Sequence, residues 1–258
     1  MSVNNQDKRH AVTRRRRGIY LLPNLFTTSA LFAGFYAIIA GINARYEAAA
    51  IAMFVAMILD GMDGRIARMT NTQSDFGVQY DSLSDLVSFG LAPALVVYQW
   101  SLFDLGKLGW AAAFVYAAAT ALRLARFNTQ AGSADKRYFQ GLPSPAAAAL
   151  IAGMIWLGVS QGLPGRGSVL VFSLPLTVLA GVLMVSNVRY HSFKEIDLRG
   201  RVRFVTVSII VLIFVFIAIN PPMTLFLVFL FYAASGPILT LLLIRRHRAA
   251  RRTGETPK

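Results

Sequence analysis

Four aspartates carry the most chemistry in this sequence, because they lie at regular spacing between long apolar stretches. Asp60 and Asp63 form the first pair, and Asp81 and Asp85 form the second. A carboxylate at the edge of a bilayer is costly and usually faces a cavity where it has a function. Four ionised carboxylates close together need cations, and oxygen ligands suit Mg²⁺ or Mn²⁺. The spacing therefore predicts a divalent-metal site, with two ions to balance four charges.

The two pairs are predicted to lie on helix faces that converge. The first face holds Asp60, Asp63, Gly64, Ala67 and Arg68, and the second holds Gly77, Asp81 and Asp85. At about 100° per residue, the first set spans an arc of about 140°. Because the connection between the two helices is short, they should be antiparallel neighbours. Two metal ions in such a place clamp phosphoryl oxygens and stabilise displacement at phosphorus. The two glycines leave room for a pyrophosphate near the backbone, and the arginine can pair with a phosphate.

Long apolar runs predict an all-α, polytopic membrane protein. The chain has 258 residues, of which 55% are hydrophobic and 15% charged, whereas a soluble domain is usually about 25% charged. The runs favour about eight transmembrane helices, placed roughly at 21–41, 47–69, 78–100, 108–127, 144–161, 168–187, 204–219 and 222–244. The absence of cysteine excludes disulfides and thiol catalysis.

Basic residues predict the orientation of the helices. Of the 26 Lys and Arg residues, all but Arg45, Lys107 and Arg166 fall on one side of the predicted spans. Basic connections stay in the cytoplasm, so both termini and the acidic segment are expected there. The division is a basic cytoplasmic segment at 1–20, a transmembrane domain at 21–244 and a basic cytoplasmic tail at 245–258. The net charge of +14 is accordingly ascribed to membrane topology and lipid contact rather than to nucleic acid.

The acidic segment resembles the signature of the CDP-alcohol phosphotransferase family at every fixed position. That signature reads D-x₂-D-G-x₂-A-R-x₈-G-x₃-D-x₃-D, and it runs here from Asp60 to Asp85. The resemblance implies an enzyme that moves a phosphatidyl-type group from a CDP-linked lipid to an alcohol and releases CMP. It implies that Asp60, Asp63 and Asp81 ligate the metals, while Asp85 completes the metal site and acts as general base. The residues implied in CDP-lipid binding are Gly64, Ala67, Arg68, Ser74, Gly77 and, in a shorter match, Asn24 and Thr27.

The acceptor alcohol is inferred from residues that lie largely outside the acidic segment. Strings at 80–90, 122–128 and 139–147 are similar to those of bacterial family members that use L-serine. The resemblance implies phosphatidyl transfer from CDP-diacylglycerol to serine in a bacterial inner membrane, with the active site facing the cytoplasm. An arginine can hold a serine carboxylate bidentately. The expected acceptor-binding residues are Arg123, Arg126, Asn128 and Arg137.

Several alternatives stay open at this point. The same chemistry can use glycerol 3-phosphate, inositol phosphate or choline as the acceptor. An intramembrane prenyltransferase also uses aspartates, and a cation transporter can use a carboxylate cluster as its ion site. Gly34 and Gly41 are suited to close helix packing, either within the chain or in a homodimer.

Overall fold

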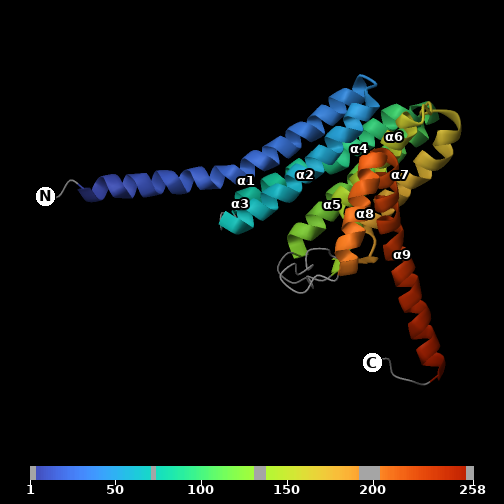
Figure 1. Ribbon diagram of the computed structural model, residues 1–258. Coiled ribbons are helices and arrows are strands. Elements are labelled where there is room, and N and C mark those ends of the chain that lie inside the picture. Colours follow the sequence, from blue (N-terminus) through green and yellow to red (C-terminus); the bar gives the residue numbers. More distant parts are fainter. Residues whose placement is uncertain (1–3, 71–73, 131–137, 192–203, 254–258) are drawn as a thin grey trace.

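The computed structural model describes residues 4–70, 74–130, 138–191 and 204–253, and in these it is almost entirely helical (Figure 1). The helices are α1 (Asn4–Ile42), α2 (Tyr46–Thr70), α3 (Asp75–Asp85), α4 (Ala92–Val97), α5 (Lys107–Gln130), α6 (Ser144–Ser160), α7 (Leu170–Val185), α8 (Phe204–Ile219) and α9 (Pro221–Thr253). The prediction of an all-α protein is confirmed. Two helices are longer than expected, because α1 begins at Asn4 rather than at residue 21 and α9 continues into the basic tail.

Four segments of the described chain are long and apolar enough to cross a membrane. They are Pro23–Ile42, Asp75–Leu105, Lys107–Thr129 and Pro221–Leu241, and two shorter apolar helices occur at Ser144–Ser160 and Leu170–Val185. Helix α8 is also apolar along its length but has only 16 residues. The chain is thus a helical membrane protein.

The segment that follows α3 changes its helical pitch several times without breaking. A π-helix, η1 (Leu86–Leu91), leads into α4, then a second π-helix, η2 (Tyr98–Leu102), and a 3₁₀ turn, η3 (Phe103–Leu105). Short π-helical stretches are rare and often occur beside functional residues. Here η1 starts directly after Asp85, and the Tyr116 hydroxyl of α5 donates to the carbonyl oxygen of Phe89 at 3.1 Å.

Small residues let α1 approach its neighbours closely. A Cβ atom on Gly34 would lie 2.6 Å from the Cα atom of Ser88, and one on Gly41 would lie 2.8 Å from a methyl carbon of Val96. The Ser88 hydroxyl donates to the carbonyl oxygen of Ala30 at 3.1 Å across the same contact. The two glycines therefore serve packing within the chain, and a homodimer would need another face.

A two-stranded antiparallel ribbon joins the bundle to α9. It consists of β1 (Tyr138–Gln140) and β2 (Arg189–His191). The sequence did not predict these two short strands. The Tyr190 side chain is buried, its ring lies against Gly236, and its hydroxyl donates to the carbonyl oxygen of Ala233 at 2.9 Å. Burial raises the pKa of the Tyr190 phenol above its ordinary value, so the group stays a neutral donor.

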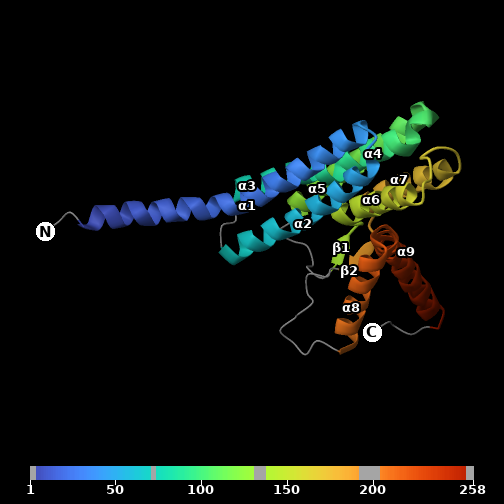
Figure 2. The same ribbon diagram turned by 45° about the horizontal axis from the view of Figure 1, so that its top comes forward.

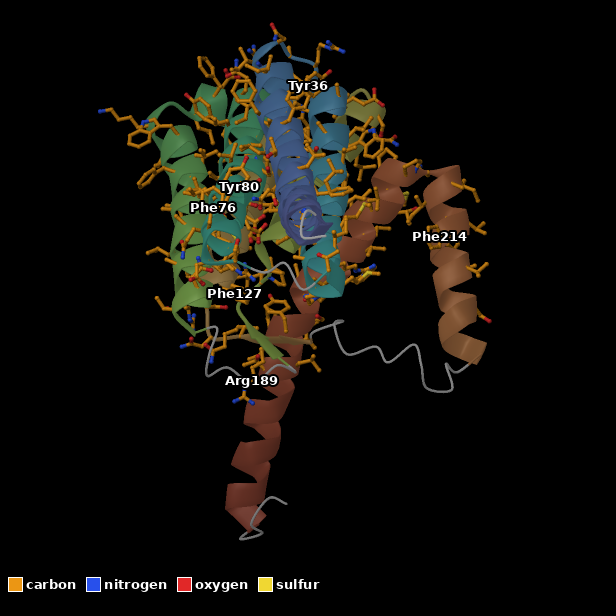
Figure 3. The ribbon with its side chains drawn as sticks, turned by 90° about the vertical axis from the view of Figure 1, so that its left-hand side faces the viewer. Tyr36, Phe76, Tyr80, Phe127, Arg189 and Phe214 are labelled. Carbon is orange, nitrogen blue, oxygen red and sulfur yellow. The ribbon has the colours of Figure 1, made fainter. Side chains whose placement is uncertain are left out.

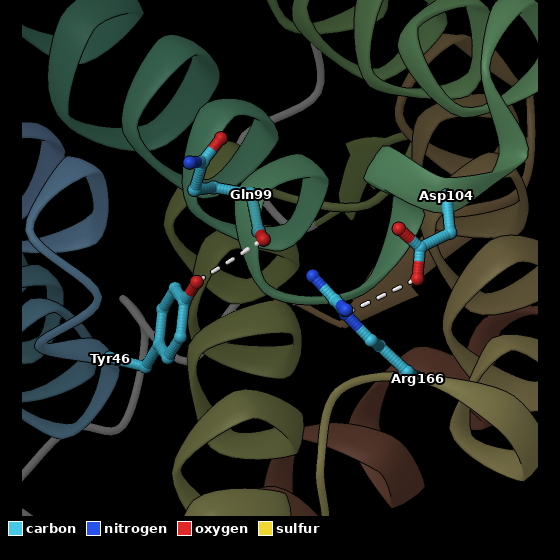
Figure 4. Close-up of polar contacts among 4 residues, drawn as sticks. All are labelled: Tyr46, Gln99, Asp104 and Arg166. Carbon is cyan, nitrogen blue, oxygen red and sulfur yellow. Dashed lines mark hydrogen bonds and ion pairs between the residues drawn. The ribbon is translucent and has the colours of Figure 1, made fainter.

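The two ends of the bundle differ in character. The end of α2, the start of α3 and the end of α5 lie together, while the tight connections α1–α2 and η3–α5 lie at the other end (Figures 1 and 2). At that second end the Tyr46 hydroxyl donates to the carbonyl oxygen of Gln99 at 3.2 Å, and Arg166 pairs with Asp104 at 3.2 Å (Figure 4). Helix α8, which carries the exposed Phe214, stands apart from the bundle (Figure 3).

Candidate metal and phosphate site

Helices α2 and α3 bring three of the four aspartates together. One carboxylate oxygen from each of Asp60, Asp63 and Asp81 lies within 4.8 Å of the others. The Asp85 carboxyl is close enough to interact electrostatically with those of Asp60, Asp81 and Asp63. The predicted convergence of two helix faces therefore occurs, at the end of the bundle where α2 finishes and α3 begins.

Helix α1 supplies the contact that orients Asp63. The Thr27 hydroxyl is buried and lies 2.8 Å from Oδ2 of Asp63, to which it donates, and 3.1 Å from the carbonyl oxygen of Pro23. The Ser84 hydroxyl of α3 in turn donates to the carbonyl oxygen of Thr27 at 3.1 Å. These two bonds connect α1 to α2 and to α3 at the Asp63 carboxylate. Thr27 thus contacts a candidate metal ligand in addition to lying near the expected CDP-lipid site.

The start of α3 has a local structural explanation. Ser74 is the N-cap residue, with an extended backbone, and its hydroxyl oxygen accepts a hydrogen bond from the backbone nitrogen of Gly77 at 3.0 Å. Such a cap contributes about 1 kcal/mol to helix stability. The side-chain oxygen of Asn24 would lie 3.7 Å from a Cβ atom on Gly77. The structure therefore brings Asn24, Ser74 and Gly77 together and gives Ser74 a capping role.

The α2 side of the site is open. A Cβ atom built on Gly64 would meet no atom within 4 Å. Ala67 is half-buried and Arg68 is exposed on the last turns of α2. Space next to Asp63 and an exposed guanidinium are what a phosphate-bearing ligand needs. The aromatic residues Phe76, Tyr80 and Phe127 lie at the same end of the bundle (Figure 3).

The expected acceptor residues separate into different environments. Arg123 is buried on α5 and donates from Nη1 to the Ser144 hydroxyl at 2.9 Å. Arg126 donates to the side-chain oxygens of Gln140 and Asn187 and to the carbonyl oxygen of Val185. The Asn128 amide nitrogen donates to the Ser82 hydroxyl at 2.9 Å. Arg137 lies outside the described residues.

The sequence assigns no role to two polar residues near the site. The Tyr116 hydroxyl donates to the carbonyl oxygen of Phe89, and the Ser144 hydroxyl accepts a hydrogen bond from Arg123. The partner of each lies far away in the chain, so no local pattern indicates these contacts. Ser84, by contrast, lies inside the acidic motif between Asp81 and Asp85, and its hydroxyl bonds to Thr27.

The donor set at this end of the bundle fits a hard divalent cation. Three carboxylate oxygens within 4.8 Å of one another offer oxygen-only ligands, which Mg²⁺ and Mn²⁺ prefer. The open space at Gly64 leaves room for further ligands from a substrate. Asp60, Asp63 and Asp81 are the residues that would hold such an ion.

Apolar helices that place a carboxylate cluster at one end of the bundle fit a membrane enzyme that works on phosphate groups. Residues 20–186 match the family described as CDP-alcohol phosphatidyltransferase, and this chain belongs to that family. Enzymes of the family use divalent metal ions. The predictions of family and of enzyme class are confirmed.

Three relatives illustrate the similarity. The chain is 39% identical over 198 residues to the CDP-diacylglycerol–serine O-phosphatidyltransferase of Helicobacter pylori, which covers 76% of this chain and 83% of that protein. It is 38% identical over 143 residues to the protein of that name in Methanocaldococcus jannaschii, covering 55% of this chain and 63% of the relative. It is 32% identical over 171 residues to the archaetidylserine synthase of Methanothermobacter thermautotrophicus, covering 66% and 69%.

Proposed function

We propose that this protein transfers the phosphatidyl group of CDP-diacylglycerol to the hydroxyl of L-serine, giving phosphatidylserine and CMP. The observation that carries the proposal is the convergence of Asp60, Asp63 and Asp81 in a chain that has the complete family signature. The names of the relatives, several of which are serine O-phosphatidyltransferases, support serine as the acceptor. CDP-diacylglycerol, serine and membrane lipids are then its partners.

The carboxylates divide the work between metal binding and proton transfer. Asp60, Asp63 and Asp81, completed by Asp85, would hold Mg²⁺ or Mn²⁺, and two ions would balance the four charges. When bound, such ions polarise phosphoryl oxygens and neutralise charge that develops on them. Asp85 accepts the proton of the serine hydroxyl as the new oxygen–phosphorus bond forms. The pyrophosphate phosphorus–oxygen bond breaks, and CMP leaves with the electron pair.

Residues on α1, α2 and the start of α3 are proposed to bind the CDP-lipid. The proposed set is Asn24, Thr27, Gly64, Ala67, Arg68, Ser74 and Gly77. The open space at Gly64 and the exposed guanidinium of Arg68 support phosphate binding on the α2 side. The position of Asn24 over Gly77 supports a contact from α1.

Among the arginines, Arg123 is the stronger candidate for the serine carboxylate. It interacts electrostatically with Asp85, the proposed base, and it is nine-tenths buried. Arg126 is instead bound to Gln140, Asn187 and Val185. Asn128 and Arg137 stay predictions of the sequence for this role.

The topology that fits this function has eight spans with both termini and the acidic cluster in the cytoplasm. The connections at 43–45, 105–107 and 161–169 carry Arg45, Lys107 and Arg166, the basic residues assigned to the far side. Among the described residues, the other basic side chains outside the two terminal helices are Arg65 and Arg68 at the end of α2, Arg123 and Arg126 on the last turns of α5, and Arg189 on β2. A bacterial inner membrane, where CDP-diacylglycerol and serine meet on the cytoplasmic face, is the proposed location.

Release of CMP from CDP-diacylglycerol tests the proposal. The protein purified in detergent is assayed with Mg²⁺ or Mn²⁺ and a panel of acceptors: L-serine, glycerol 3-phosphate, inositol phosphate and choline. We expect only L-serine to stimulate release, with an Asp81→Asn variant as the inactive control. Stimulation by another alcohol would overturn serine as the acceptor. No CMP release with any of them would overturn the reaction itself.

A further inference from the structure

The guanidinium of Arg123 on α5 is buried, and the protein uses its donors only in part. Arg123 is 9% exposed, and its Nη1 atom donates to the hydroxyl of the fully buried Ser144 at 2.9 Å. The Nε atom of Arg123 has no hydrogen-bond partner among the described residues. A buried charge with an unused donor is costly unless an anion completes it. The arrangement therefore indicates a place for an anionic group of a ligand.

The bond to Ser144 determines which edge of the Arg123 guanidinium faces a ligand. A guanidinium is planar, and its five N–H donors point in fixed directions. Nε shares one edge of the plane with Nη2, and Nη1 is not part of that edge. A carboxylate binds such an edge through two parallel hydrogen bonds. Ser144 thus holds the side chain through Nη1 and presents the edge that contains the unpartnered Nε.

The segment that enters α6 keeps Ser144 in place. Ser144 is the first residue of α6 and follows Pro143, the N-cap residue, whose ring restricts the backbone. The preceding residue, Leu142, is fully buried, and its backbone nitrogen donates to the carbonyl oxygen of Leu183 on α7 at 2.9 Å. The Ser144 hydroxyl therefore meets Arg123 from a backbone that is fixed before the helix and within it.

Helix α5 runs antiparallel to the segment formed by α3 and η1, and two contacts show how they are aligned. The Asn128 amide nitrogen donates to the Ser82 hydroxyl at 2.9 Å. A Cβ atom on Gly90 would lie 3.2 Å from the Cβ atom of Thr120. The same number of residues separates the two contacts on α5 and on the α3–η1 segment. Residues between the contacts are therefore level in pairs.

Arg123 and Asp85 both lie between these two contacts. Asp85 follows Ser82 by one helical turn, and Arg123 precedes Asn128 by somewhat more than one turn. At about 1.5 Å per residue, the two positions differ by roughly 3 Å along the bundle. A carboxylate bound to Arg123 therefore lies at the depth of Asp85, the proposed base.

We propose that Ser144 is a positioning residue that holds Arg123 so that the edge containing Nε binds the carboxylate of the amino-acid acceptor. The inference rests on the proposed function, and it adds a residue of α6 to a site built on other helices. The guanidinium edge donates two hydrogen bonds to a carboxylate, and an acceptor that lacks a carboxylate cannot accept them. Ser144 acts through Arg123 rather than on the acceptor.

The kinetics of Ser144→Ala test this role, because the change removes only the hydroxyl. Without its partner at Nη1, the guanidinium loses its fixed orientation, and we expect the KM for L-serine to rise about 10-fold. The KM for CDP-diacylglycerol should change less than about twofold, since other residues are proposed to bind that substrate.

Ser101→Ala is the matched control, because it also removes a buried serine hydroxyl with a buried partner. The Ser101 hydroxyl lies 2.6 Å from that of Ser173, between η2 and α7. Both Ser101→Ala and Ser144→Ala are expected to unfold at a somewhat lower temperature in detergent. Only Ser144→Ala should change the serine KM.

A double variant tests whether Ser144 acts through Arg123. Arg123→Lys keeps the positive charge but lacks the planar edge, so it should raise the serine KM at least about 10-fold. Once the edge is gone, the Ser144 hydroxyl has nothing to orient. Adding Ser144→Ala to Arg123→Lys should then raise the serine KM less than about twofold further.

Three results would overturn the inference while leaving the proposed function standing. They are an unchanged serine KM in Ser144→Ala, equal rises of the two KM values in that variant, and a full further 10-fold rise in the double variant. The second result indicates a structural role, and the third indicates that Ser144 acts independently of Arg123. A wild-type enzyme that serine does not stimulate would instead overturn the proposed function, and the inference with it.

Discussion

At the scale of single residues, Thr27 is the clearest case of a side chain that supports the site from another helix. Its hydroxyl donates to Asp63 at 2.8 Å, and both residues are buried. A partner of this kind orients a metal ligand, and its loss typically lowers metal affinity or activity by about 10- to 100-fold. We expect Thr27→Val to lower the rate of CMP release by a similar factor and to raise the Mn²⁺ concentration for half-maximal activity.

Two further variants make the Thr27 prediction specific. Thr27→Ser keeps the hydroxyl and should stay near the wild-type rate. Thr177→Val removes another buried threonine hydroxyl, which donates to the carbonyl oxygen of Ser173 within α7, and should leave the Mn²⁺ dependence unchanged. Equal effects of Thr27→Val and Thr177→Val would contradict the role assigned to Thr27.

Asp85 is expected to matter more for turnover than for substrate binding. An amide in its place cannot accept the serine proton, and loss of a general base typically costs about 10²- to 10⁴-fold in rate. We therefore expect Asp85→Asn to lower kcat by at least about 100-fold while the protein unfolds at a temperature near that of the wild type. Near-normal turnover at saturating Mg²⁺ would contradict the assignment of Asp85 as base.

Arg126 is expected to act on stability rather than on serine binding. Its guanidinium joins α5 to β1 and to the end of α7, and hydrogen bonds from a charged group contribute about 1.5–3 kcal/mol. Arg126→Ala should lower the unfolding temperature in detergent while the serine KM of the remaining folded enzyme stays within about twofold. A large rise in serine KM without loss of stability would place Arg126 in the acceptor site instead.

At the scale of elements, the contact between α1 and η1 is expected to tolerate only a very small side chain at position 34. A Cβ atom on Gly34 would overlap the backbone of Ser88, and overpacking of this kind typically costs about 1–3 kcal/mol. Gly34→Val should therefore lower the unfolding temperature measured in detergent. Gly61→Ala serves as the control for stability, because a Cβ atom there meets nothing within 4 Å. A Gly34→Val protein as stable as the wild type would contradict this packing.

The sequence predicts those elements whose information is local. The acidic motif places Asp60 and Asp63 on one helix face and Asp81 on another, and the structure brings the three together. The π-helix after Asp85 was not predicted, because its backbone depends on long-range contacts such as the bond from Tyr116 to Phe89. The ribbon was missed for a similar reason, since β1 and β2 are three residues each and pair across two intervening helices.

At the scale of the whole molecule, the absence of cysteine makes the topology directly testable. Under the proposed orientation, Lys107→Cys and Arg166→Cys should each react with a membrane-impermeant maleimide added outside the cytoplasm. A cysteine at Thr129, near the end of α5, should react only after the membrane is made permeable. The exposed pair of Arg166 and Asp104 contributes little to stability, so the substitution is tolerable. The reverse labelling pattern would contradict the proposed orientation.

The place of α9 in the chain has a consequence for how the protein is made. The four aspartates have all been synthesised by residue 85, whereas α9 begins only at Pro221. In the finished chain Gly153 of α6 lies against the backbone of Phe226 of α9. Synthesis therefore completes the carboxylate cluster first, and that face of α6 is covered by its own chain last.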